Sequence, residues 1–160
     1  MTPSSTTSAG MTTKLVLFQL QGRDHALPVD QIVEIVRMVE VTPVPESPDW
    51  LAGVINVRGR VIPVMDLRLR LGFEPQEAGL RTPIIVAETG GHMLGLIADF
   101  VSEMLSLPPQ AIEVAEEHGD SPISAMAQAG ERLIVIVDLE RLCNDTEGLV
   151  FARNHGDDES

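Results

Sequence analysis

The rest of this chain is arranged around the stretch Leu51–Leu71, LAGVINVRGRVIPVMDLRLRL. Two runs rich in β-branched residues flank a short polar connection, Asn56–Arg60. This arrangement is typical of a β-hairpin, because Gly59 can supply the positive φ that a tight reversal needs. After the second run, Asp66 is placed to cap a short helical turn that Gly72 ends. The stretch therefore predicts a strand, a turn, a second strand and a helical turn.

Short apolar segments separated by turn residues continue on both sides of this hairpin. The predicted strands outside it cover residues 15–20, 25–29, 33–41, 82–87, 92–98, 100–107, 123–129 and 133–137. Strands of this length and spacing indicate a barrel or a sandwich. Asp66-Leu67 and Asp138-Leu139 each follow a strand, which suggests two halves of one duplicated plan. The prolines at 108 and 109 break the sheet, and the acidic segment 110–122 is predicted to be a loop.

Composition restricts the class of protein and its partners. The 160 residues are 44% hydrophobic but only 3% aromatic, so Val, Ile, Leu and Met must build the core. A formal net charge of −13 disfavours nucleic acids and anionic membranes as partners, because both attract basic surfaces. The single cysteine cannot form an internal disulfide, and neither a spanning helix nor a secretory signal is visible, which predicts a cytoplasmic protein.

The two ends of the chain differ in composition from the rest. Residues 1–13 are rich in Ser and Thr and are expected to be a disordered N-terminal tail. Residues 144–160 end in Asp-Asp-Glu-Ser and are expected to form a mobile acidic tail.

No motif of the sequence predicts catalysis, a metal ion or a cofactor. The four histidines lack metal-ligand spacing, and no glycine-rich phosphate loop is present. Cys143 lies in an apolar turn and is expected to be a buried small hydrophobic residue. A small hydrolase would need a site assembled from residues such as Asp66, His92 and Asp99, and their spacing does not support one.

Arg58 and Arg60 lie at the tip of the predicted hairpin in a strongly acidic chain. Both could be solvated groups that form weak surface ion pairs. At least one could instead anchor a partner, because arginine makes forked contacts and is enriched at interface hot spots. Residue chemistry alone leaves both interpretations open.

The chain resembles the CheW family of bacterial chemotaxis adaptors. The resemblance covers residues 14–143, and the block NVRGRVIPVMDLR is its most specific part. The matching segments are Phe18–Val29, Ile32–Ile35, Val44–Pro48, Gly53–Arg68, Thr82–Glu88, Gly95–Leu105 and Arg132–Leu139. Two positions depart from the family pattern, since His25 stands where an aromatic residue is usual and Ala125 where a glycine is common.

This resemblance implies two SH3-like five-stranded β-barrel subdomains that share a hydrophobic seam, with their boundary near residues 72–82. Terminal segments can cross that boundary. It also implies a non-catalytic adaptor that joins the regulatory domain of a CheA-type histidine kinase to the cytoplasmic tips of chemoreceptors. The missing catalytic motifs and the high negative charge predict a protein that is monomeric on its own and has no cofactor. An adaptor of the same fold in a pilus-motility or other non-flagellar chemosensory pathway is the alternative. The family positions for partner binding fall on Ile32, Glu34, Asn56, Arg58, Gly59 and Met104.

Overall fold

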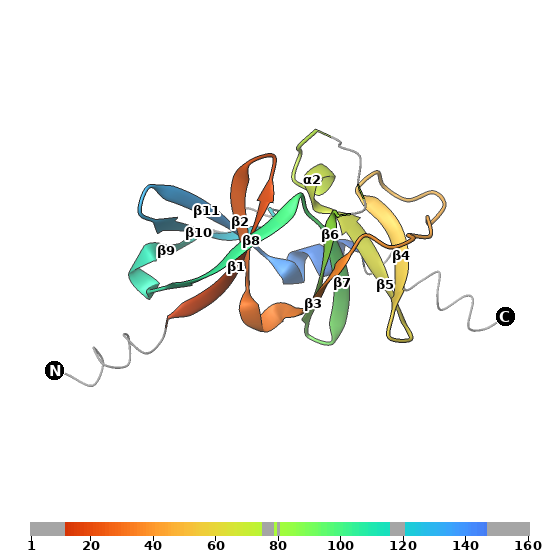
Figure 1. Cartoon of the computed structure of the whole chain (residues 1–160), viewed down its shortest axis with the longest axis horizontal. Coiled ribbons are helices and arrows are strands. Elements are labelled where there is room, and N and C mark those ends of the chain that lie inside the picture. Colours follow the sequence, from red (N-terminus) through yellow and green to blue (C-terminus); the bar gives the residue numbers. More distant parts are fainter. Residues whose placement is uncertain (1–11, 75–78, 80, 116–120, 147–160) are drawn as a thin grey trace.

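The computed structural model describes residues 12–74, 79, 81–115 and 121–146, and it contains two antiparallel-rich β-sheets (Figure 1). One sheet has six strands in the order β8-β1-β2-β11-β10-β9, and the other has five in the order β3-β6-β7-β5-β4. The mainly β fold with two subdomains is therefore confirmed, with one strand more than expected in the first sheet. The strands of the first sheet are β1 (Thr13–Leu20), β2 (Arg23–Pro28), β8 (Phe100–Leu107), β9 (Ile112–Val114), β10 (Ile123–Ala129) and β11 (Arg132–Val137).

The second sheet is built from the middle of the chain. Its strands are β3 (Ile32–Arg37), β4 (Leu51–Val57), β5 (Arg60–Asp66), β6 (Pro83–Thr89) and β7 (His92–Ile97). The chain passes from the first sheet to the second through the 3₁₀ helix η1 (Val29–Gln31) and returns at residues 98–99. The boundary expected near residues 72–82 therefore does not separate the two sheets.

That boundary instead separates two halves of the chain that repeat one plan. Each half supplies a hairpin, β1–β2 or β6–β7, and then a strand that pairs with the hairpin of the other half. Each half then supplies a second hairpin, β4–β5 or β10–β11, whose last strand pairs in parallel with the first hairpin of the other half, β5 with β7 and β11 with β2. The order β8-β1-β2-β11-β10 thus repeats the order β3-β6-β7-β5-β4.

Most of the predicted local structure is present. The hairpin β4–β5 reverses at residues 58–59, and Asp66 caps α2 (Leu67–Arg70) by accepting a hydrogen bond from Arg68 N at 3.1 Å. Gly72 follows α2 with a φ of +90°. Strand β3 is shorter than predicted, since it begins at Ile32 and ends at Arg37.

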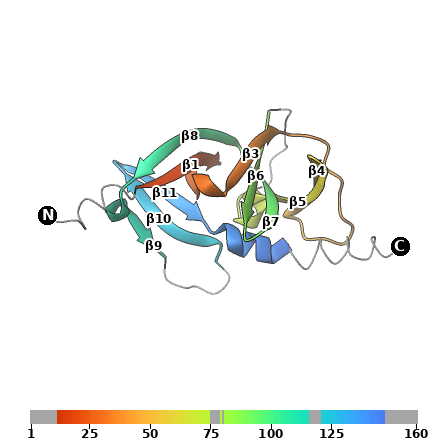
Figure 2. The ribbon, with the colours of Figure 1, turned by 90° about the horizontal axis from the view of Figure 1, so that it is seen from below.

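Two corrections concern the second half of the chain. The segment 110–122, predicted as a loop, contains most of the 3₁₀ helix η2 (Pro109–Ala111) and the short strand β9, which pairs with β10. The helical turn predicted after Asp138 is a longer C-terminal helix, residues 139–146, which lies between the two groups of strands (Figure 2). Residues 144–146, assigned above to the acidic tail, therefore belong to the folded part.

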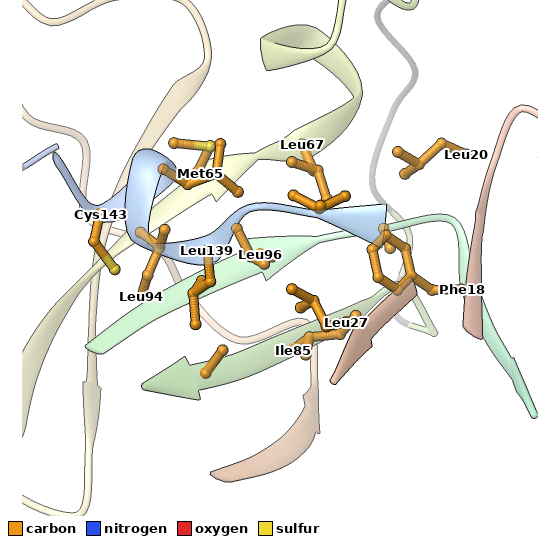
Figure 3. Close-up of a cluster of buried hydrophobic side chains, with 14 residues drawn as sticks. Phe18, Leu20, Leu27, Met65, Leu67, Ile85, Leu94, Leu96, Leu139 and Cys143 are labelled. Carbon is orange, nitrogen blue, oxygen red and sulfur yellow. The ribbon is translucent and has the colours of Figure 1, made fainter. Parts of the chain in front are cut away.

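Three apolar clusters fill the molecule, and the largest is the predicted seam. Phe18 and Leu27 from the first sheet meet Leu67, Ile85 and other residues from the second-sheet side, and the C-terminal helix adds Leu139 and Cys143 (Figure 3). The predicted burial of Cys143 is confirmed. Each sheet also has a smaller cluster of its own. Burial at roughly 25 cal/mol per Å² of apolar surface makes these clusters the main source of stability.

A buried arginine links the two sheets beside this seam. Arg68, only 2% exposed, contacts both carboxylate oxygens of Asp66 at 2.9 and 3.0 Å and Asp99 Oδ1 at 3.3 Å. Asp99 also accepts a hydrogen bond from Gln21 N, at the turn between β1 and β2, at 2.6 Å. These contacts satisfy a cation that would otherwise be costly to bury, and they connect the end of β5 to the first sheet.

No helix within the described residues is long and apolar enough to cross a membrane.

Candidate functional site

The site begins with the shape of the β4–β5 turn. Arg58 and Gly59 both have positive φ, +54° and +87°, between the paired residues Val57 and Arg60. Two positive φ values define the I′ type of two-residue hairpin, which matches the twist of the strands. Asn56 supports the turn, since its Oδ1 accepts a hydrogen bond from Gly59 N at 3.0 Å. The turn holds the Arg58 backbone firmly at the end of the hairpin.

Arg58 forms an ion pair with Glu34 across the open side of the second sheet. Its Nε lies 3.0 Å from Glu34 Oε2, and the Arg58 side chain is 81% exposed while that of Glu34 is 23% exposed. Glu34 belongs to β3 and Arg58 to the β4–β5 turn, and β3 and β4 are the two edge strands of this sheet. Thr42 and Val54 exchange two backbone hydrogen bonds of 2.9 Å along the same side. The pair therefore connects the turn to an edge strand while leaving the arginine open to a partner.

Strand β3 alternates between half-buried and exposed residues. Ile32 and Glu34 are half-buried, and Ile32 packs against the seam cluster. Val33 and Ile35 point to the other face and are 48% and 44% exposed. Exposed apolar residues on an edge strand are available for pairing with another protein. Sequence reasoning missed these two residues, because Ile32–Arg37 reads apolar-apolar-charged twice and the alternation appears only in the burial of the folded strand.

Met104 lies apart from the other predicted residues. It belongs to β8, one of the two edge strands of the six-stranded sheet, where it is paired with Val16 and is 59% exposed. The structure thus brings Glu34, Asn56, Arg58 and Gly59 together, with Ile32 on the same strand as Glu34. Strand β8 is the counterpart of β3 in the repeated plan, so Met104 occupies an equivalent edge in the other sheet.

The residues considered for hydrolysis do not form a catalytic arrangement. Asp66 and Asp99 both contact the Arg68 guanidinium and so serve as its counter-ions. His92 begins β7, whereas Asp66 pairs with Ile97 at the other end of that strand, roughly 16 Å away at 3.3 Å per residue. Among the described residues, no group of three or more His, Cys, Asp or Glu side chains could hold a metal ion.

Two side chains of the hairpin strand β2 have shifted pKa values. A hydrogen bond from Arg132 lowers the pKa of Asp24, and burial lowers the pKa of His25. The His25 ring stacks on Phe18 with centroids 6.1 Å apart and meets the edge of Phe73 at 5.7 Å. The His25 ring therefore packs between two aromatic rings as an aromatic side chain would.

Comparisons with known proteins agree on one family. The CheW-like domain family matches residues 14–147. A probable chemotaxis protein CheW from Rhizobium etli is 31% identical over 138 residues, which cover 84% of this chain and 89% of that protein. A chemotaxis protein CheW from Bacillus subtilis is 32% identical over 129 residues, 78% of this chain and 83% of that protein.

A solved structure has the same fold. The crystal structure of the scaffolding protein TtCheW from Thermoanaerobacter tengcongensis superposes with a TM-score of 0.74 at 31% identity, over 79% of this chain and 89% of that one. Residues 14–147, which the family model matches, span the strands of both sheets from Lys14 onward, the β4–β5 turn and the C-terminal helix. The chain therefore belongs to the CheW-like family.

Proposed function

We propose that this chain is a non-catalytic chemotaxis adaptor that couples a CheA-type histidine kinase to the cytoplasmic tips of chemoreceptors. The observation that carries the proposal is the presentation of Arg58, an 81% exposed cation on a rigid turn of an acidic protein, within 3.0 Å of Glu34 on an edge strand. An adaptor of this kind would work in the cytoplasm and reach the membrane only through the receptors it binds.

The two edge strands support a scaffolding role. Strand β3 offers Val33 and Ile35, and β8 offers Met104, all exposed on strands that lie at the edge of their sheet among the described residues. A related β-domain of the kinase can associate with such an edge, and an apolar surface suits a helical receptor tip. Neither contact requires chemistry, which fits the use of Asp66 and Asp99 as counter-ions to Arg68.

The test is a pull-down of kinase and receptor with Arg58→Glu beside Arg60→Glu as the matched control. Both arginines are exposed and lie at the same turn, but Arg58 is the one that pairs with Glu34. Assembly with Arg58→Glu should fall about tenfold or more, because losing an arginine hot spot costs about 2 kcal/mol and reversal adds repulsion. Assembly with Arg60→Glu should stay close to wild type.

Stability of both variants must be measured in the same preparation. Exposed substitutions usually change the free energy of unfolding by less than about 0.5 kcal/mol, so both proteins should melt like wild type. If the folded Arg58→Glu protein binds kinase and receptor as well as wild type does, the tip of the hairpin is only a solvated turn. That result would remove the main support for this proposal. Binding to a pilus-motility assembly in place of a flagellar one would move the adaptor to that pathway without changing the interface.

A further inference from the structure

A cleft lies on a part of the molecule that the proposed site does not use. Its volume is about 600 Å³, and its wall is formed by β2, β10, β11 and the residues that follow α2. Most of the lining is apolar, including Phe73, Met126 and Leu133. Leu133 is 60% exposed although it lies on the cleft wall. An apolar concave surface of this size is expected to have an occupant.

The described chain ends beside this cleft. Arg70, which lines the cleft, contacts Asp145 Oδ2 through both Nε at 2.9 Å and Nη2 at 2.8 Å. Thr146, the last described residue, is buried, and its hydroxyl donates to Cys143 O at 3.0 Å. The end of the C-terminal helix is therefore held against the cleft by a forked, charge-assisted contact.

The sequence beyond residue 146 complements the cleft in two ways. Its acidic end follows an apolar group, Leu149–Ala152. Phe151 is six residues after Asp145, so an extended chain reaches up to roughly 20 Å from that anchor. Arg23, exposed at the cleft, forms no ion pair within the described part of the chain and can attract the carboxylates of Asp157, Asp158 and Glu159.

We propose that the segment Leu149–Ala152 of this chain packs into the cleft between β2, β10, β11 and the residues after α2, with Arg70 and Asp145 as its anchor. The tail is then a cover for exposed apolar surface, and the acidic end of the chain lies near Arg23. The acidic composition at the end of the sequence draws attention away from this apolar group.

The experiment disables the tail within the full-length chain. The full-length double variant Leu149→Asp/Phe151→Asp should leave the cleft empty. It should therefore bind a synthetic peptide with the wild-type sequence of residues 147–160, and isothermal titration calorimetry measures this binding. Binding to wild type should be about tenfold weaker, because the tethered tail competes at an effective concentration of order millimolar. Asn154→Asp/His155→Asp adds the same charge outside the apolar group and should behave like wild type.

A second substitution in the disabled chain locates the binding site. Leu133→Asp should abolish peptide binding, whereas Val114→Asp should not, because Val114 is 77% exposed on the same sheet and does not line the cleft. Neither side chain is buried, so both proteins should keep their circular dichroism spectra. Equal binding to the two variants, or no binding to the disabled chain, overturns the proposal. If the wild-type protein dimerises while the disabled chain stays monomeric, the tail binds the cleft of a second copy. That result would also overturn the proposal.

Discussion

Two arginines at opposite ends of β5 show how burial decides what an ion pair does. The Arg58 side chain is 81% exposed and pairs with Glu34, while that of Arg68 is 3% exposed and pairs with both Asp66 and Asp99. Exposed pairs contribute little to stability because water and salt screen them. A buried cation cannot lose its partners without leaving charge in a medium of low dielectric constant. Arg68 is therefore structural, and Arg58 is available to a partner.

The largest expected effect comes from removing the buried cation. Arg68→Leu leaves Asp66 and Asp99 facing each other without a counter-ion, so the free energy of unfolding should fall by about 3–5 kcal/mol. Arg58→Leu should change it by less than about 0.5 kcal/mol. Urea unfolding followed by circular dichroism measures both. Equal losses for the two variants would break the comparison.

The shape of the exposed tip should matter more to folding than its charge. Gly59→Val puts a β-branched side chain at a φ of +87°, and because no atom lies within 4 Å of the added Cβ, the penalty is one of backbone conformation. The expected loss is about 1–3 kcal/mol. Arg60→Val, at the next residue, is the matched control and should lose much less. A melting temperature for Gly59→Val equal to wild type would show that the turn changes type without cost.

Protonation of His25 would place a positive charge in the buried region between the sheets, and we expect it to lower the stability of the fold. The His25 ring stacks on Phe18 and contacts Phe73, whose N donates to Arg68 O at 2.8 Å. Burial lowers the pKa of His25, so the unfolded chain binds the proton more readily than the folded one. The contribution of neutral His25 to the free energy of unfolding is therefore complete above the unfolded pKa of about 6.5, and it is lost as the pH falls below that value.

The measurement compares wild type with His25→Phe at several pH values. The free energy of unfolding of wild type should fall relative to that of the variant between about pH 7 and pH 5, by at most about 1.4 kcal/mol per pH unit. Phenylalanine cannot titrate and keeps the aromatic packing. Parallel pH profiles for the two proteins would mean that another group controls this range.

The smallest expected effect is the coupling between Glu34 and Arg58. A double-mutant cycle with Glu34→Gln and Arg58→Gln should give a coupling energy below about 1 kcal/mol. It should decrease further in about 1 M salt, where the screening length is only about 3 Å. A coupling that stays large in high salt would make this pair structural like Arg68 and would weaken the assignment of the tip to recognition.

Local patterns predicted the hairpin and the Asp66 cap because each depends on neighbours in sequence. Gly59, Asp66 and Gly72 act within a few residues of their own positions. Strand β9 was missed because its three residues lie in an acidic segment and owe their conformation to pairing with β10. The C-terminal helix was predicted too short because Thr146 is held by tertiary burial.

The residues of the candidate site remain a prediction from the family pattern, and the sequence did not indicate the contacts between them. The family pattern selected Glu34 and Arg58 separately, and nothing local indicates that residues on β3 and the β4–β5 turn meet across an open side of the sheet. Arg68 was not singled out because, in the alternating run after Asp66, it looks like one more exposed cation. Its burial depends on the folded structure, in which Asp99 from the other half of the chain accepts a hydrogen bond from its guanidinium.

The exchange of strands between the halves has a consequence for the order of folding during synthesis. Strand β3 pairs with β6, and β1 pairs with β8, which is synthesised much later. Neither sheet can therefore form completely until most of the chain has left the ribosome. Pairings between residues far apart in sequence raise the contact order and slow folding. The two sheets are also expected to unfold together, as one cooperative unit, because each contains strands of both halves. A nascent first half would therefore expose β1 and β3 as unpaired edges, which makes it a natural client for chaperones.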